Sequence, residues 1–154
     1  MAEPRFTDQC EEVFRIAKEE ARGMKHPVVT SGHILLAILL ENYGLASYVL
    51  KKNGFKKEII RLALRVLIPQ YHGCLSDDIP WSDGAQEITK LAPEISRQLN
   101  YSHISTEHLL LAALWDSNNT RRNMYHVYHI FALFEITPRE IKNLLLNLSG
   151  FCKL

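Results

Sequence analysis

Two stretches of this chain repeat each other at an offset of 75 positions, and this repetition limits the folds that the chain can adopt. Residues 31–39 read SGHILLAIL, and residues 106–114 read TEHLLLAAL. The same offset relates the triplet FTD at 6–8 to the triplet WSD at 81–83. A tandem duplication within 154 residues predicts two small repeats that share one hydrophobic core. Leu35 and Leu110 are equivalent at this offset, and both are expected to be buried there.

Apolar residues recur at helical spacing through both copies, and capping residues mark several helix starts. The pattern predicts helices over about 7–24, 31–41, 45–52, 56–68, 82–99, 106–116, 127–134 and 138–148. Pro93 is expected to kink the fifth helix, because proline removes an N–H and clashes with the preceding turn. No strand pattern is found. The predicted fold class is all-α, with two tandem four-helix repeats related by pseudo-twofold symmetry.

The boundaries follow from the composition of the connecting segments. Repeat 1 covers about 6–69 and repeat 2 about 81–148, and the turn-forming residues of 70–80 form a linker between them. The whole of 1–154 is therefore interpreted as a single module. The second copy has six extra residues, which we place in the polar segment 117–123 and predict to be an enlarged, exposed loop.

Charge and composition exclude several classes of partner. The net charge of +1 gives no field that would attract nucleic acid. The fourth helix has a basic face, formed by Lys56, Lys57, Arg61 and Arg65. No aromatic residues interleave this face, so a solvated surface is favoured over a nucleic-acid site. No apolar run approaches the ~18 residues that a membrane span needs, so no membrane partner is expected.

The cysteines and the N-terminus indicate a reducing compartment. Cys10, Cys74 and Cys152 are odd in number and widely spaced, which favours free or buried thiols over disulfides or a metal site. The first residues lack the apolar core of a signal peptide. A cytoplasmic location is therefore expected.

The motifs of catalysis and metal binding are missing. The sequence contains no phosphate-binding loop, no HExxH motif and no cysteine pair at metal spacing, so we expect no enzyme activity, no metal and no cofactor. His126 and His129 lie three apart but lack a third ligand nearby, which favours a packing role. His33 and His108 are expected to be half-buried and bonded to neighbouring backbone. Cys10 has no recognisable base beside it, which argues against a nucleophile.

Aligned in this way, the two repeats resemble the N-terminal domain of the Clp-type AAA+ unfoldases, most closely the ClpC and ClpA group. Each repeat of that family opens with Phe/Tyr-Thr and reaches a Gly-Thr-Glu-His-Ile-Leu-Leu phrase. The corresponding residues are FT at 6–7 with TSGHILL at 30–36, and WS at 81–82 with STEHLLL at 105–111. The resemblance extends from Phe6 to about Leu148.

The resemblance implies a non-catalytic binding module of ATP-dependent proteolysis, with a Clp ATPase or the Clp protease core, adaptors and substrates as partners. The sequence stops at Leu154 without ATPase modules, so the chain is either a domain of a larger protein or a free-standing relative. Its last residues have no tag or linker composition, which favours a free-standing adaptor, accessory subunit or competitor for substrates and adaptors. A plant accessory subunit would lie in the plastid stroma. The alternative is a stand-alone sensor that binds a small molecule or an arginine-phosphorylated peptide without a Clp partner.

The resemblance also implies candidate ligand-binding residues. In the ClpC branch each repeat can hold a phosphorylated arginine, through the Thr at the repeat start and the Glu of the Thr-Glu-His phrase. By position, the second repeat offers Ser82 with Glu107, preceded by Thr106. The first offers Thr7 but has Gly32 in place of the carboxylate, so its site is expected to be lost, because glycine cannot pair with a guanidinium. Thr106 and Glu107 can alternatively serve only to cap their helix.

Overall fold

The computed structural model describes residues 3–115 and 124–148, and within these ranges the chain is almost entirely helical. The elements in chain order are β1 (Arg5–Phe6), α1 (Asp8–Gly23), α2 (Ser31–Glu41), α3 (Leu45–Lys52), α4 (Lys57–Leu67), α5 (Asp83–Gln98), β2 (His103–Ile104), α6 (Thr106–Ala113), α8 (Tyr125–Leu133) and α9 (Pro138–Leu148). All eight predicted helices are present, which confirms the all-α fold class.

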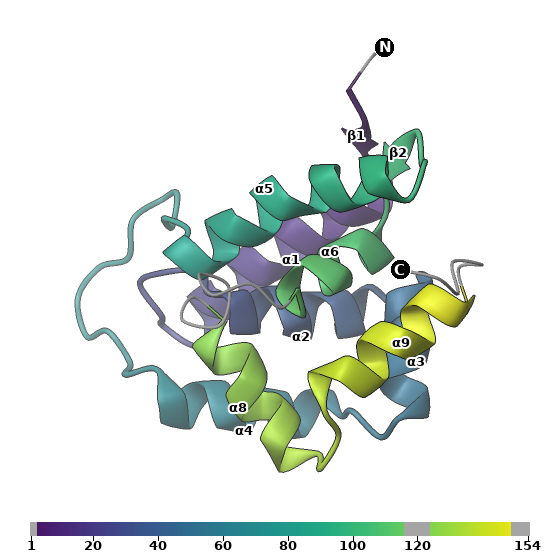
Figure 1. Ribbon diagram of the computed structural model, residues 1–154. Helices are drawn as coiled ribbons and strands as arrows, with labels where there is room; N and C mark the ends of the chain where they lie inside the picture. Colours follow the sequence, from purple (N-terminus) through teal and green to yellow (C-terminus); the bar gives the residue numbers. More distant parts are fainter. Residues whose placement is uncertain (1–2, 116–123, 149–154) are drawn as a thin grey trace.

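The first two helices of each repeat form the centre of the molecule. α1 packs along α2, α5 packs along α6, and α2 also contacts α6 (Figure 1). Helix α2 is buried from Ser31 to Leu39 because it is apolar on nearly every side and is covered by both repeats. Leu35 and Leu110 are both fully buried, as expected. The hydrophobic core is continuous across the two repeats.

The remaining helices exchange partners between the repeats. The third helix of repeat 1, α3, packs against α9, the last helix of repeat 2. Its counterpart α8 packs in the same way against α4, the last helix of repeat 1 (Figure 1). After the six extra residues of the second copy, α3 is equivalent to α8 and α4 to α9, so this exchange follows the predicted twofold relation.

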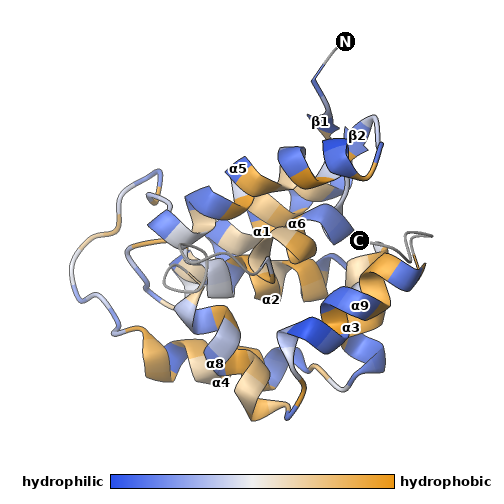
Figure 2. Ribbon diagram, in the orientation of Figure 1, coloured by the Kyte–Doolittle hydropathy of each residue, from blue (hydrophilic) through white to orange (hydrophobic). Residues whose placement is uncertain are grey.

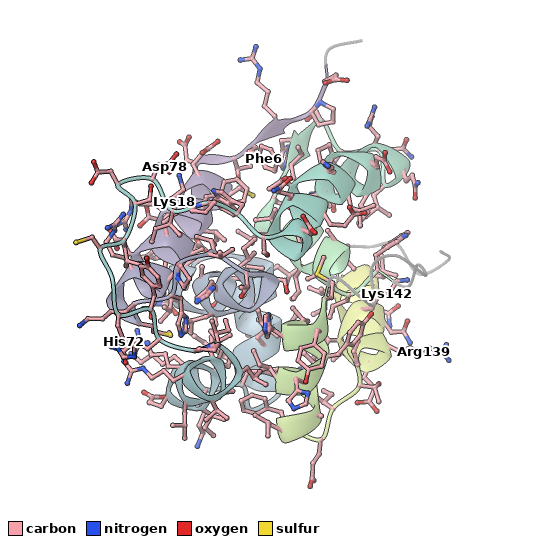
Figure 3. The ribbon with its side chains drawn as sticks, turned by 90° about the vertical axis from the view of Figure 1, so that its left-hand side faces the viewer. Phe6, Lys18, His72, Asp78, Arg139 and Lys142 are labelled. Atoms are coloured by element: carbon pink, nitrogen blue, oxygen red, sulfur yellow. The ribbon has the colours of Figure 1, made fainter. Side chains whose placement is uncertain are left out.

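The linker between the repeats is held against α1. Arg22 donates to the backbone oxygens of Ser76 and Asp77 at 2.9 and 2.8 Å, and Lys18 forms an ion pair with Asp78 at 3.4 Å. Lys18 and Asp78 lie side by side in Figure 3. Residues 70–80 contain neither helix nor strand, so the linker crosses the surface as an extended strap.

The structure differs from the sequence-based expectations in two places. Two short strands, β1 and β2, were not predicted, because a pair of residues is too short to show alternation. Helix α6 ends at Ala113 rather than near 116. Pro93 lies inside α5 as expected, and the kink there stays a prediction. The predicted loop at 117–123 lies outside the described residues.

No single helix among the described residues has the length and hydropathy of a membrane span. α2 and α3 reach such a length only together, as a pair bent by 95°.

Candidate functional site

Each repeat begins by pairing with the other repeat. β1 and β2 are parallel, with Phe6 opposite Ile104, and an isolated parallel bridge joins Val29 to Trp81. The offset of 75 converts the first of these pairs into the second. The start of each repeat is therefore paired with the segment that precedes the apolar central helix of the other repeat.

The first of these attachments surrounds the start of α1. The Thr7 N–H donates to the Ile104 oxygen at 3.0 Å, and the Thr7 Oγ1 caps α1 by accepting from the Cys10 N–H at 3.3 Å. The Cys10 Sγ donates to the same Ile104 oxygen at 3.2 Å. Thr7 is thus fixed beside the residues that lead into α6.

Glu107 also lies near the start of α1. It is the second residue of α6 and is partly exposed. Burial raises the pKa of the Cys10 thiol to about 11, the bonds from Thr7 oppose this shift, and the Glu107 carboxylate adds to it. The pKa of Tyr101 is also raised, first by burial and then by Glu107. The carboxylate therefore lies near the start of α1, and we call Thr7, Cys10, Ile104 and Glu107 the Thr7–Glu107 junction.

Thr106 does not share this position. It is only 1% exposed, and a Cβ placed on Gly44 would lie 2.2 Å from its Oγ1. Its hydroxyl is therefore enclosed against the start of α3. Of the two residues Thr106 and Glu107, the structure leaves only Glu107 accessible to a ligand.

Ser82 lies in the other attachment. Its Oγ caps α5 by accepting from the Ala85 N–H at 3.1 Å, and its own N–H donates to the Val29 oxygen at 2.9 Å. The segment beside it leads into α2, where Gly32 occupies the position equivalent to Glu107. We call Ser82, Val29, Trp81 and Gly32 the Ser82–Gly32 junction. A hollow of about 340 Å³ lies at this start of α5, lined by Trp81, Gln86 and Thr89.

This arrangement corrects the expected pairing of the site residues. The sequence places Ser82 with Glu107 and Thr7 with Gly32, because each pair belongs to one repeat. In the structure the strands cross, so Thr7 lies with the start of α6 and Ser82 with the segment before α2. One junction combines a hydroxyl with a carboxylate, and the other has a hydroxyl alone.

Gly32 is also closed to a side chain. A Cβ at this position would lie 2.5 Å from the Leu64 Cδ2 and 3.1 Å from the Cβ of His126. These neighbours come from α4 and α8, which cover this helix start. The loss of the carboxylate from the first repeat is therefore accompanied by filling of the space that it would need.

The histidines of the two apolar helices form matching caps. The Nδ1 of His33 accepts from the Thr30 N–H, and the Nδ1 of His108 accepts from the Ser105 N–H, both at 2.9 Å. The expected backbone bonds are confirmed, but both side chains are fully buried rather than half-buried. Because Nδ1 accepts, Nε2 carries the proton in each ring.

The partners of the two Nε2 atoms differ. The His33 Nε2 donates to the Nδ1 of His26 at 2.8 Å, whereas the buried His108 Nε2 has no hydrogen-bond acceptor in the described structure. Tyr101 occupies the position equivalent to His26, and its ring meets that of His108 edge to face at 4.7 Å. Burial lowers the pKa of His33 to about 3. Both histidines are therefore neutral structural groups near neutral pH.

His126 and His129, the remaining candidate metal ligands, lie three residues apart on α8. His126 is half-buried beside Gly32, and burial lowers its pKa, while His129 is exposed. In the part of the chain that the structure describes, no group of three His, Cys, Asp or Glu side chains is placed to hold a metal ion.

Comparison with known proteins gives concordant matches. The model of the Clp repeat (R) N-terminal domain family matches residues 5–126. An ATP-dependent Clp protease ATP-binding subunit ClpA homolog from Cyanidium caldarium is 38% identical over 110 residues, which are 71% of this chain and 13% of that protein. The chloroplastic chaperone protein ClpC2 of rice, Oryza sativa subsp. japonica, is 36% identical over 71% of this chain and 12% of its own length. The match thus spans about an eighth of these relatives.

Solved structures agree on the fold. The N-terminal domain of Hsp104 from Candida albicans has a TM-score of 0.77 at 23% identity, covering 96% of this chain and 93% of that chain. The N-terminal domain of ClpD from Arabidopsis thaliana has a TM-score of 0.72 at 17% identity, covering 95% and 98%.

Proposed function

Because this chain belongs to the Clp repeat (R) N-terminal domain family, we propose that it is a non-catalytic binding module of the Clp ATP-dependent proteolysis system. Its proposed partners are a Clp ATPase or the Clp protease core, together with adaptor or substrate proteins. It acts as an adaptor, an accessory subunit or a competitor for substrates and adaptors. The curated relatives are ATP-binding subunits and chaperones of Clp proteases, which supports a role in the same system.

The observation that carries this proposal is the Thr7–Glu107 junction. Glu107 offers a carboxylate that can form a bidentate pair with a guanidinium. The Thr7 hydroxyl accepts from Cys10 and still has its own O–H to donate to an anionic group. The start of α6 adds the positive end of a helix dipole, which favours a phosphate. An arginine or phosphoarginine side chain of a protein partner matches this combination.

The chemistry of the nearest nucleophile supports a binding role. The Cys10 thiol is buried, and its pKa of about 11 keeps it protonated at neutral pH. The histidines near the two helix starts are held neutral by burial and by their backbone bonds. These groups serve the packing of the module, and Glu107 is the charged member of the junction that can meet a ligand.

The experiment is a pull-down of a purified Clp ATPase and its protease core with this chain as bait. We expect the wild-type chain to retain at least one of them, and Glu107→Ala to reduce the retained amount. Glu94→Ala is the matched control, because Glu94 is also a helical glutamate but is exposed on α5, outside both junctions. Equal retention by both variants would show that the junction does not mediate the contact, and no retention by the wild type would contradict the proposal.

A second candidate function is a stand-alone sensor for a small molecule or an arginine-phosphorylated peptide, without a Clp partner. The junction favours it because one carboxylate and one hydroxyl suffice for a single side chain. Measuring peptide binding and the retention of Clp components on the same preparation distinguishes the two functions, because a stand-alone sensor would bind the peptide but retain no Clp component. We place the protein in the cytoplasm, or in the plastid stroma for a plant accessory subunit, and fractionation with a tagged chain tests this.

A further inference from the structure

Helix α4 carries an apolar stripe that the fold leaves uncovered. Its core side holds Ile60, Ala63 and Leu64, all of which are buried. On another side, Ile59, Leu62 and Val66 are 41%, 64% and 77% exposed. The spacing of three and four residues places these three on one line along the helix. A solvated helix face in this position would be polar, so the stripe calls for a partner.

Helix α8, which packs against α4, also carries exposed apolar side chains. The Phe55 ring, just before α4, packs on Phe131 at 4.8 Å, whereas Leu64 and His126 meet at Gly32. The two helices are therefore antiparallel, with the end of α8 beside the start of α4. On α8, Tyr125 and Leu133 are 56% and 55% exposed. Figure 2 shows hydrophobic segments alternating with hydrophilic ones on both ribbons.

We call Ile59, Leu62, Val66, Tyr125 and Leu133 the α4–α8 patch.

Two charges flank the stripe on α4 in a self-complementary way. Glu58 and Arg65 are seven residues apart, so they lie on the same flank at opposite ends of the stripe. Both are exposed, and neither forms an ion pair with another described residue. Arg61, which lies between them, is already paired with Glu20 at 2.7 Å.

We propose that the α4–α8 patch binds a second copy of this chain through a twofold axis at Leu62. An antiparallel pair of α4 helices about this axis places Ile59 of each copy opposite the Arg65–Val66 end of the other. It also brings Glu58 of each copy beside Arg65 of the second, which creates two equivalent ion pairs on one flank. Leu133 and Tyr125 lie at opposite ends of α8, so the same rotation places Leu133 of each copy opposite Tyr125 of the other. A closed twofold interface of this kind buries the stripe of both copies at once.

The charge pattern is what favours a second copy over an unrelated helix. An unrelated amphipathic helix requires only an apolar face. Here, a twofold rotation that brings Leu62 of one copy onto Leu62 of the other also places Glu58 of each copy beside Arg65 of the other, so the charges as well as the apolar side chains are matched. The patch shares no residue with the Thr7–Glu107 junction, which carries the proposed function, so this inference is independent of that function.

Sedimentation equilibrium of the full chain tests the association, at protein concentrations up to about 500 µM. We expect a concentration-dependent dimer for the wild type and a monomer for Leu62→Arg. Leu148→Arg is the matched control, because Leu148 is an exposed leucine of α9 outside the patch. It should dimerise as the wild type does, and circular dichroism confirms that both variants are folded. A monomeric wild type, or equal association of the two variants, would overturn the inference.

A charge exchange tests the register. Glu58→Arg and Arg65→Glu each turn both ion pairs into like-charge contacts, so each alone should weaken dimerisation about tenfold or more. An equimolar mixture of the two variants restores both pairs within one heterodimer and should recover association near the wild-type strength. Recovery in the mixture supports the twofold register, and failure to recover would overturn it, even if the wild type dimerises. Binding of a Clp component at the patch in place of self-association would likewise overturn it.

Discussion

The Thr7–Glu107 junction and the Ser82–Gly32 junction are built on the same backbone and differ in what their side chains can bind. In both, a repeat start pairs with the segment before a central helix of the other repeat, and a hydroxyl caps the first helix. At the first junction this cap lies near a partly exposed carboxylate. At the second, the equivalent position is a glycine enclosed by Leu64 and His126. Both repeats of the duplicated fold thus retain the same backbone geometry, but only the Thr7–Glu107 junction has a charged group that can bind a ligand.

The comparison also shows why the loss is structural as well as chemical. At the first junction α6 begins with a residue that reaches solvent. At the second, α4 and α8 cover the start of α2, and a buried His26–His33 pair stands where the other repeat has Tyr101 and His108. Repeat 1 has used this helix start for packing.

The largest effect should come from the shared core, where the two repeats are alike. Leu35→Ala and Leu110→Ala each remove a fully buried side chain, and each should lower the free energy of unfolding by ~2–5 kcal/mol. Urea denaturation measures both. Leu148→Ala, at an exposed position, should change it by less than about 0.5 kcal/mol. A core variant that unfolds at the wild-type urea concentration would show that the two leucines are not equivalent.

The next largest effect should come from Gly32, the glycine that distinguishes the Ser82–Gly32 junction from the Thr7–Glu107 junction. Gly32→Ala forces a Cβ against Leu64 and His126 and should cost about 1–3 kcal/mol through overpacking. Gly23→Ala is the control, because nothing lies within 4 Å of a Cβ there, and alanine is the better helix former. Thermal unfolding of both variants measures the difference. If Gly32→Ala is as well tolerated as Gly23→Ala, the helix start of repeat 1 is open, and its lost site could be restored by a carboxylate alone.

The buried His33 of repeat 1 should make the free energy of unfolding depend on pH more strongly than its counterpart in repeat 2, His108, does. Burial lowers the pKa of His33 to about 3, whereas in the unfolded chain its pKa lies near the ordinary histidine value of 6.5. The unfolded state therefore binds more protons below pH 6.5, and stability falls as the pH decreases from 6.5 toward 3. The contribution of His33 to this slope is about 1.4 kcal/mol per pH unit.

His33→Asn keeps an acceptor for the Thr30 N–H and removes the titrating ring. It should flatten the pH dependence of the urea midpoint between pH 6.5 and 4.5 more than His108→Asn does. The pKa of His108 is also lowered by burial, but the Glu107 carboxylate opposes the shift. Equal slopes in the wild type and in His33→Asn would contradict this assignment.

The repeat pattern was sufficient to predict the helices and the core. Apolar spacing and caps predict the bounds of α1, α2 and α9 closely. These helices bury one face or all faces, and a threonine immediately precedes each of them: Thr7, Thr30 and Thr137. The strands could not be found in this way. Each strand is only two residues long and pairs with residues 98 positions away, so local periodicity carries no trace of this pairing.

The site was only half predictable for the same reason. Alignment of the repeats identifies Thr7 with Ser82 and Gly32 with Glu107, but it does not say which members meet. The twofold packing decides this, and it exchanges them. The enclosure of Thr106 by Gly44 depends on the position of α3 and has no local signal.

The most direct test of the crossed, unequal junctions is calorimetric titration of the protein with an arginine-phosphorylated peptide. We predict one site per chain. Glu107→Ala should abolish it, and Thr7→Ala should weaken it about tenfold to a hundredfold, the value of one charge-assisted hydrogen bond of roughly 1.5–3 kcal/mol. Ser82→Ala, which removes the same type of cap at the other junction, should leave the affinity unchanged. Two equal sites, binding that survives Glu107→Ala, or a loss with Ser82→Ala and not with Thr7→Ala would contradict the account.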